Sequence, residues 1–168
     1  WWTSDAQAVI DRACFFDDTY VFNADGSFSN VLGADTWLEV WQGTADACGT
    51  PVAPYDGLAA ATYAYDAVAG TVTINGTGAY LGIPKANNAG ELPNVGVPTS
   101  ITYDIVLSNN DNTMDLVIEA GPGVFWSFKL VRDGAIAPPP VEGTWKIAPE
   151  VGALKVGDSY GAGNWWTS

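Results

Sequence analysis

Two tryptophans and a glutamate alternate along one predicted strand, as Trp37, Glu39 and Trp41. Side chains on a strand alternate between its two faces, so residues at i, i+2 and i+4 share a face. Two indole rings beside a carboxylate can stack on sugar rings while the carboxylate holds their hydroxyl groups. These residues are therefore a candidate sugar-binding surface. The alternative is packing, in which both indoles lie under an N-terminal helix or inside a barrel and Glu39 is hydrogen-bonded or lies at the rim.

The residue types argue against catalysis. The chain contains no histidine, which excludes Ser-His-Asp and Cys-His arrangements for nucleophilic attack. A glycosidase needs two carboxylates that face one another across a cleft. Asp17 and Asp18 are consecutive on a predicted strand and point to opposite faces, so they are not that pair. We expect a protein that is not an enzyme and that uses no cofactor.

Two acidic turns are weak candidates for calcium binding. The turn over 23–26 contains Asp25 and superficially resembles the start of an EF-hand loop, but the later glutamate of that motif is missing. The turn over 109–112 contains Asp111 and is similarly rich in oxygen ligands. Hairpins use Asn, Asp and Gly at such places to reach positive φ. Turn formation is therefore the expected role, and no metal site is predicted.

The chain has two cysteines, Cys14 and Cys48. An even pair in an extracellular-looking chain favours a disulfide. Closing a loop of ~35 residues contributes roughly 4 kcal/mol in the chain-entropy model. We predict a disulfide that ties the end of an N-terminal helix to the loop after the Trp37 strand. Two buried thiols are the alternative.

The composition limits the partners. Six Lys+Arg stand against 19 Asp+Glu, a net charge of −13. This charge repels phosphate backbones, so we expect no nucleic-acid partner. No apolar run approaches the ~18 residues of a membrane-spanning helix. One methionine, no histidine and few lysines fit an extracellular or cell-surface protein.

The tetrapeptide Trp-Trp-Thr-Ser occupies positions 1–4 and again positions 165–168. Tryptophan is rare, so we interpret the repetition as one period of a near-identical tandem array. If the segment is extended, only one of two adjacent tryptophans can face a core, which leaves the other for a neighbour or for solvent. A local cap over a barrel end is the alternative. The candidate contacts between repeats are Trp1, Trp2, Trp145, Trp165 and Trp166.

Local patterns predict one short helix followed almost only by strands. Ser4 and Gln7 have the spacing of a capping box, which predicts a helix over roughly 5–13 with Val9, Ile10 and Ala13 buried. Beyond it, alternating apolar and polar residues predict antiparallel strands. We expect them over 15–22, 27–32, 36–42, 61–65, 71–74, 101–107, 114–118 and 125–131. The predicted core includes Phe22, Phe28, Ile74, Ile105, Leu116 and Leu130.

Two segments interrupt this pattern. Residues 82–100 are rich in Pro, Asn and Gly and have little periodicity, and loops of that length are usually functional or mobile. Residues 135–142 contain three consecutive prolines, which impose polyproline II and predict a semi-rigid linker. A new strand is expected to begin at Gly143.

Several motifs resemble one family. Gly143-Thr144-Trp145-Lys146-Ile147 resembles the opening strand of bacterial lipocalin-like domains. Cys14, followed by Phe22-Asn23-Ala24-Asp25-Gly26-Ser27-Phe28, is similar to their cysteine and F-N-x-D-G-T-F hairpin, and a hairpin ending in Phe128-Lys129-Leu130 also fits. The similarity covers most of the chain in rotated order, 141–168 followed by 1–134. It implies eight to ten antiparallel strands and no catalytic residues. Similar tandem units accompany secreted bacterial surface proteins and polysaccharide-degrading enzymes.

We therefore expect an all-β fold, an antiparallel lipocalin-like barrel or flattened sandwich with one short N-terminal helix. Residues 1–134 would form most of one repeat, 135–142 a linker, and 143–168 the first-strand region of the next repeat. In this frame, 143–168 packs against a different copy of the domain, because an unpaired sheet edge accepts an added strand.

Three hypotheses for function follow. The first is a non-enzymatic structural repeat of an extracellular bacterial fibre, stalk or surface filament, joined head to tail through its C-terminal segment to neighbouring copies of itself. The alternative is a carbohydrate-binding module of a secreted polysaccharide-degrading or adhesive protein, with glycans as partners. The third is a lipocalin-like pocket for a small apolar ligand.

Overall fold

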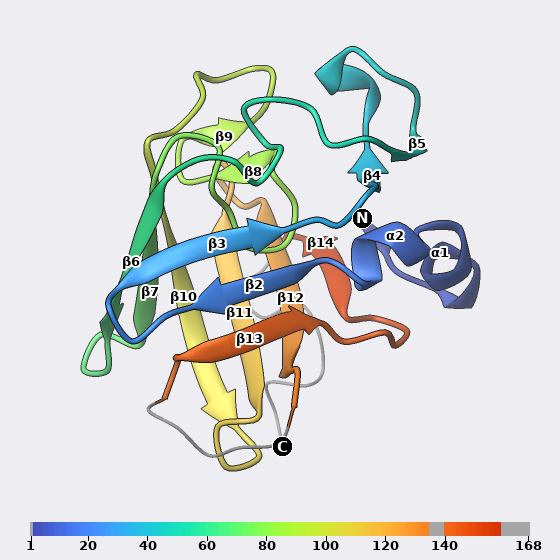
Figure 1. Cartoon of the computed structure of the whole chain (residues 1–168). Helices are drawn as coiled ribbons and strands as arrows, with labels where there is room; N and C mark the ends of the chain where they lie inside the picture. Colours follow the sequence, from blue (N-terminus) through green and yellow to red (C-terminus); the bar gives the residue numbers. More distant parts are fainter. Residues whose placement is uncertain (1, 135–139, 159–168) are drawn as a thin grey trace.

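An eight-stranded antiparallel barrel makes up most of the molecule (Figure 1). The computed structural model describes residues 2–134 and 140–158. Around the barrel, the strands follow the order β2-β3-β6-β7-β10-β11-β12-β13, and β13 pairs again with β2. The prediction of an all-β antiparallel barrel is confirmed.

The strand bounds follow the alternation in the sequence closely. The barrel strands are β2 (Thr19–Phe22), β3 (Ser27–Val31), β6 (Ala61–Asp66), β7 (Thr71–Asn75), β10 (Ser100–Ser108), β11 (Thr113–Glu119), β12 (Phe125–Arg132) and β13 (Gly143–Ile147). The other elements are β1 (Trp2–Thr3), α1 (Ala6–Asp11), α2 (Ala13–Phe16), β4 (Thr36–Leu38), the 3-10 helix η1 (Val40–Gln42), β5 (Ala47–Gly49), β8 (Ala86–Asn87), β9 (Gly90–Glu91) and β14 (Leu154–Gly157). The predicted strand over 15–22 is shorter than expected because its first residues are helical.

Strand β12 pairs with two strands along one edge. Near its C-terminal end, Arg132 is opposite Trp145 of β13. Near its N-terminal end, Trp126 is opposite Val156 of β14. Val156 in turn is opposite Trp2 of β1. The two ends of the described chain therefore lie side by side in one sheet.

Strand β13 completes the barrel of its own chain. Trp145 is opposite Tyr20 of β2 as well as Arg132 of β12, and its side chain is 0% exposed. The indole N–H donates to the Val141 carbonyl oxygen at 2.9 Å. The expectation that 143–168 packs against a different copy is therefore wrong for the described residues 143–158. Their partners are β2, β12 and β1 of the same chain.

The Pro-rich segment connects two neighbouring strands of one barrel. It follows β12 and precedes β13, which hydrogen-bond to each other. Its described end is tied down, because the Arg132 guanidinium donates to the carbonyl oxygens of Pro140 and Glu142 and because Val141 is buried. The interpretation of 135–142 as a linker between two domains does not agree with this placement. Residues 135–139 lie outside the described part.

The N-terminal helix differs from its prediction in both cap and buried side. The N-cap is Asp5, whose carboxylate accepts the Ala8 backbone N–H at 2.8 Å. Ser4 is fully buried instead, and its hydroxyl oxygen accepts the Gly152 N–H at 3.1 Å. Helix α1 has no buried residue, and Ile10 is exposed.

None of the described helices has the length and apolar character needed to cross a membrane.

The short helix α2 supplies the fully buried residues of this region, whereas α1 contributes the partly buried Val9. The α2 residues Cys14, Phe15 and Phe16 are buried, and the two phenylalanine rings meet edge to face at 5.4 Å. The predicted buried side is therefore wrong for Ile10 and Ala13, which are exposed, whereas Val9 is partly buried and packs against the core. The fully buried residues lie in α2, one helical turn later in the sequence than predicted.

Side chains fill the barrel interior. All six predicted core residues are buried: Phe22, Phe28, Ile74, Ile105, Leu116 and Leu130. Tyr20, Tyr103, Phe128 and Trp145 add large aromatic groups to the same cluster. An interior filled in this way gives no support to a ligand site inside the barrel.

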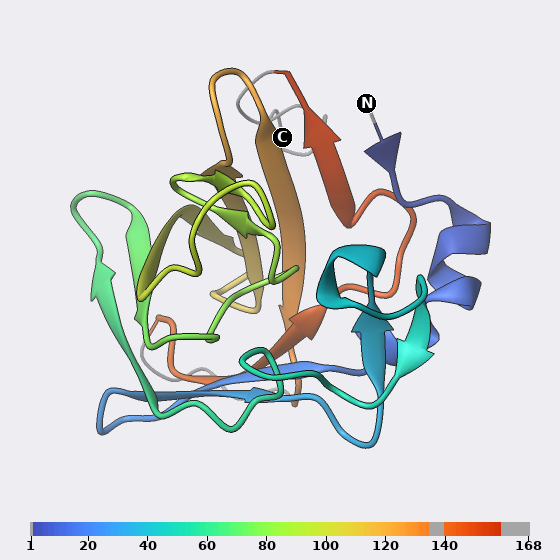
Figure 2. The ribbon, with the colours of Figure 1, turned by 90° about the horizontal axis from the view of Figure 1, so that it is seen from above.

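The segment over 79–83 closes one end of the barrel. The Tyr20 hydroxyl donates to the Gly82 carbonyl oxygen at 2.9 Å, and the Leu81 N–H donates to the Tyr103 hydroxyl at 2.9 Å. Gly82 has φ +73°, and a Cβ there would lie 2.3 Å from the Phe128 ring. Only glycine fits this position. Seen from above, β8 and β9 lie over the barrel, and the segment with β4, β5 and η1 lies beside it, next to the N-terminal helices (Figure 2).

Candidate functional site

A ladder of three side chains from β1, β14 and β12 forms one wall of a hollow at this end. Trp2 is opposite Val156, and Val156 is opposite Trp126. Residues directly opposite one another in a sheet lie on the same face. All three therefore line one hollow of about 300 Å³, which we call the polar hollow.

Two cations lie over the tryptophan rings of this hollow. The Arg12 guanidinium is 4.8 Å from the Trp2 ring centroid and 4.4 Å from that of Trp37, so one cation contacts two rings. The Lys85 ammonium is 4.8 Å from the Trp126 ring centroid. Cation–π contacts of this kind are worth about 0.5–2 kcal/mol each. The Arg12 contacts hold β1 and β4 against the N-terminal helices, and the Lys85 contact holds the 82–100 loop against β12.

Two carboxylates complete the polar hollow. Glu39 accepts from the Lys85 ammonium at 3.0 Å and from the Trp41 indole N–H at 2.8 Å. Glu91 accepts from the Trp126 indole N–H at 2.7 Å. The hollow therefore combines aromatic walls, two cations and two carboxylates whose positions are set by hydrogen bonds.

The predicted sugar-binding trio does not share a strand face. Strand β4 ends at Leu38, and Val40–Gln42 form the 3-10 helix η1, which Gly43 ends with φ +81°. Trp37 contacts Arg12, Glu39 lines the polar hollow, and Trp41 lines a second hollow. The alternation argument is therefore wrong beyond Leu38, although Glu39 and Trp41 are joined by a hydrogen bond.

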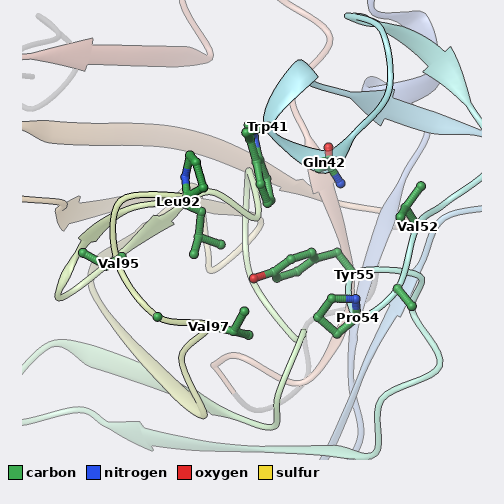
Figure 3. A pocket seen from close by; sticks show the side chains of 11 residues that line it. Trp41, Gln42, Val52, Pro54, Tyr55, Leu92, Val95 and Val97 are labelled. Carbon is green, nitrogen blue, oxygen red and sulfur yellow. The ribbon is translucent and has the colours of Figure 1, made fainter.

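The second hollow has a volume of about 450 Å³ and is lined almost entirely by apolar groups (Figure 3). We call it the apolar hollow. One side comes from η1 and the 52–55 segment, and the other comes from the 82–100 loop. Its lining residues are Trp41, Gln42, Val52, Ala53, Pro54, Tyr55, Leu92, Pro93, Val95, Gly96 and Val97. The 82–100 loop thus lines both hollows, through Lys85 and Glu91 in one and through residues such as Leu92, Val95 and Val97 in the other.

The candidate contacts between repeats separate into three groups. Trp2 lies in the polar hollow and contacts Arg12. Trp145 is a core residue of its own barrel, so its assignment to an inter-repeat contact is wrong. Trp1, Trp165 and Trp166 lie outside the described residues.

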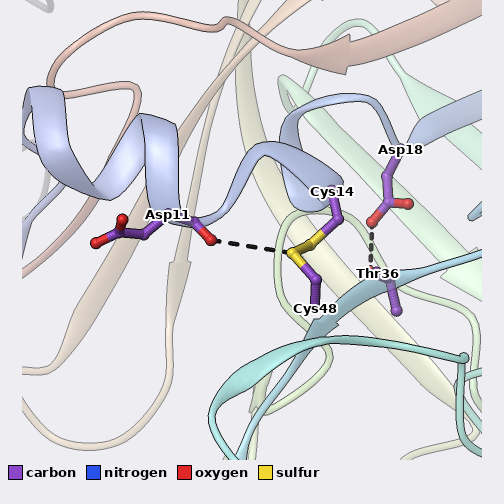
Figure 4. Close-up of a disulfide and its surroundings, with 5 residues drawn as sticks. All are labelled: Asp11, Cys14, Asp18, Thr36 and Cys48. Atoms are coloured by element: carbon purple, nitrogen blue, oxygen red, sulfur yellow. Dashed lines mark hydrogen bonds between the residues drawn. A yellow bond between two sulfur atoms is a disulfide. The ribbon is translucent and has the colours of Figure 1, made fainter.

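The predicted disulfide is confirmed. Cys14 of α2 is bonded to Cys48 of β5, with their Cα atoms 6.0 Å apart (Figure 4). The bond attaches the segment that carries β4, β5 and η1 to the N-terminal helices. These are the elements that supply Glu39, Trp41 and Arg12 to the two hollows, so the disulfide also holds the site together.

Replacing both Cys14 and Cys48 with alanine is expected to lower the free energy of unfolding by about 2–4 kcal/mol, because the unfolded chain gains the freedom of the opened loop. Urea denaturation of the variant and of the oxidised protein measures the difference. The reduced wild-type protein is the control and should match the variant. A difference below about 1 kcal/mol would contradict the prediction.

The two acidic turns are explained by turn geometry. Asp25 accepts the backbone N–H and the hydroxyl of Ser27 at 2.9 and 2.7 Å, which lowers the pKa of Asp25. Asp111 has φ +59°, and its carbonyl oxygen accepts from the Arg132 guanidinium. The cluster of metal-ligating side chains found among the described residues is Cys14, Cys48 and Asp35. Its two sulfurs are already bonded to each other.

Several residues of the two hollows were not predicted from the sequence: Arg12, Tyr55, Lys85, Glu91 and Trp126. They come from parts of the chain that only the closed barrel brings together. One feature of the sequence could have pointed to two of these residues. The chain has six Lys+Arg, and two of them, Arg12 and Lys85, lie over tryptophan rings at the polar hollow.

Comparison with protein-family models, curated proteins and solved structures finds no match to this chain. The resemblance to lipocalin-like tandem domains therefore stays a prediction from the motifs.

Proposed function

We propose that this chain is one non-catalytic unit of an extracellular tandem array, a stalk or filament in which units follow one another head to tail. The proposal depends on one observation. Residues 2–4, the described part of the first Trp-Trp-Thr-Ser copy, dock on β14 through defined contacts, which supports a structural role for the second copy at 165–168.

The contacts of residues 2–4 support this role. Trp2 and Thr3 pair with Val156 and Lys155 of β14. Ser4 is fully buried, and its backbone N–H donates to the Leu154 carbonyl oxygen at 2.9 Å. A second copy of the tetrapeptide can make the same contacts with β14 of a following barrel. The stretch 158–164 would then be the connection between two units.

The cysteine and charge chemistry supports an extracellular location. Disulfides persist in oxidising surroundings and are rare in the cytosol of most organisms, and this chain has one that joins two parts of its site. A net charge of −13 keeps neighbouring units soluble and mutually repelling, which favours an extended array.

A protein with two units in tandem tests the proposal. Residues 1–164 followed directly by a second 1–168 should give a particle whose maximum dimension in small-angle X-ray scattering is about twice that of the single chain. Both units should unfold at the temperature of the single chain. Alanine at the junction residue Trp166, which repeats Trp2, should lower the unfolding temperature of one unit by roughly 3–6 °C.

The matched control is Trp2→Ala in the single chain, which should produce a shift of the same size. A tandem protein that scatters as a compact particle, or a junction substitution without effect on either unit, would contradict the array.

A second candidate function is glycan binding in the polar hollow. The specific observation is that Trp2 and Trp126 form walls of the open polar hollow. The same hollow is also lined by Glu39, Glu91 and Lys85.

Affinity electrophoresis in gels containing soluble polysaccharides tests this function. Retardation that is lost in Glu91→Gln and kept in Glu150→Gln, an exposed carboxylate outside the hollow, would support it. Equal mobility in gels with and without polysaccharide would contradict it.

A further inference from the structure

The apolar hollow is not explained by the array or by glycan binding. Its aromatic walls are Trp41 and Tyr55, whose rings meet nearly perpendicular with centroids 5.6 Å apart. The remaining lining is mostly Pro, Val, Leu and Ala side chains, with the Gln42 amide as the other polar side chain. No lining residue carries a charge, so the hollow suits an uncharged molecule. Its volume of about 450 Å³ lies within the range of small-molecule sites in proteins.

The hydroxyl group of Tyr55 is the feature that indicates a ligand. Tyr55 is 5% exposed, and its hydroxyl is buried without a hydrogen-bond partner. The buried hydroxyls of Tyr20 and Tyr103 each have a backbone partner in the barrel. Figure 3 shows the Tyr55 hydroxyl extending into the hollow, between Leu92 and Val97. Burying a polar group without a partner is costly, so a ligand oxygen at this point would satisfy it.

The walls of the hollow are held in place before any ligand enters. The Trp41 indole N–H is bonded to Glu39, and Glu39 is bonded to Lys85. The Gln42 amide oxygen accepts the Glu39 backbone N–H at 3.0 Å. Burial raises the pKa of Tyr55 above its ordinary value of 10, so its hydroxyl keeps its proton at neutral pH. A preorganised site loses less affinity to the ordering of side chains.

We propose that the apolar hollow is a binding site for a small, uncharged, ring-containing molecule that carries one hydrogen-bonding oxygen. The rings of such a molecule lie against Trp41, Pro54 and Leu92. Its oxygen pairs with the hydroxyl of Tyr55. This site lies outside the barrel, between η1 and the 82–100 loop.

Two matched probes, 2-naphthol and naphthalene, test the proposal through quenching of tryptophan fluorescence or isothermal titration calorimetry of the full chain. Both should bind saturably, with 2-naphthol about two- to tenfold tighter, as expected for one net hydrogen bond. Tyr55→Phe keeps the ring and removes the hydroxyl, so this difference between the probes should disappear. Val97→Trp fills the hollow and should abolish the binding of both probes.

Val106→Trp is the matched control, because Val106 on β10 is 45% exposed and Val97 is 46% exposed. It should bind both probes like the wild-type protein. Unfolding temperatures show that each variant is folded. The proposal is overturned if 2-naphthol does not saturate the wild-type protein up to its solubility limit, or if the two tryptophan variants bind equally well. A probe difference that persists in Tyr55→Phe overturns the role of its hydroxyl.

Discussion

Replacing Trp145 with alanine is expected to lower the free energy of unfolding by about 3–5 kcal/mol, the range for large aromatic side chains removed from a core. Trp145 is 0% exposed and lies where β13 joins β2 to β12. The substitution also removes the indole hydrogen bond to Val141 and the contact with the Arg132 guanidinium, 4.3 Å from the ring centroid. Urea denaturation at two protein concentrations measures the effect.

Lys146→Ala is the control on the same strand. The Lys146 ammonium makes a 3.3 Å ion pair with the half-exposed Asp133, so its loss should cost less than about 1 kcal/mol. Closure of the barrel within one chain requires that the cost of Trp145→Ala be independent of protein concentration. A cost that changes with concentration would mean that another copy supplies β13, as the rotated motif order first suggested. A cost below about 1 kcal/mol would contradict the core position of Trp145.

The hairpins and the core were predictable because their signals are local. Tyr103, Ile105 and Leu107 alternate with polar residues, and Asn109 to Asp111 all adopt positive φ in the structure. A turn of this kind sets the register of the two strands that it joins. The buried face of each strand then follows from the period of two.

The helix cap and the Trp37 strand were not predictable because distant contacts decide them. Ser4 has the residue type of an N-cap, but its hydroxyl is used by Gly152 and Leu154 at the other end of the chain. The strand that begins at Thr36 ends at Leu38, and the Val40 N–H is bonded to the Asp46 carboxylate. A local pattern contains no information about such partners.

The candidate site was predictable only in part. Glu39 and Trp41 were singled out for their spacing and do lie at the two hollows, bonded to each other. Their other partners, Lys85 and Tyr55, come from loops that the fold brings over the barrel end. The cysteine pair was the exception, because two cysteines allow a single pairing.

Asp18 is expected to make the protein less stable as the pH rises from about 4 to about 8. The side chain is 2% exposed, and burial raises its pKa from 3.8 to about 8, with the charges of Asp17 and Asp35 adding to the rise and the Thr36 hydrogen bond opposing it. Because the folded-state pKa lies above the unfolded value, the protonated form favours folding. This contribution is fully present below the unfolded pKa and is lost as the pH approaches the folded pKa.

Asp18→Asn removes this titration while keeping a neutral side chain of the same shape beside Thr36, whose hydroxyl donates to the Asp18 carboxylate at 2.6 Å. Between pH 4 and pH 9, the unfolding free energy of the wild-type protein should fall relative to that of the variant. The fall should be on the order of 5 kcal/mol, since each pKa unit corresponds to about 1.4 kcal/mol. Asp104→Asn on β10 is the matched control, because it removes one negative charge from an exposed position whose charge is not among those that raise the Asp18 pKa. Urea denaturation at several pH values compares the three proteins. If Asp18→Asn and Asp104→Asn show the same pH dependence, the Asp18 carboxylate does not titrate as a buried group and the prediction is wrong.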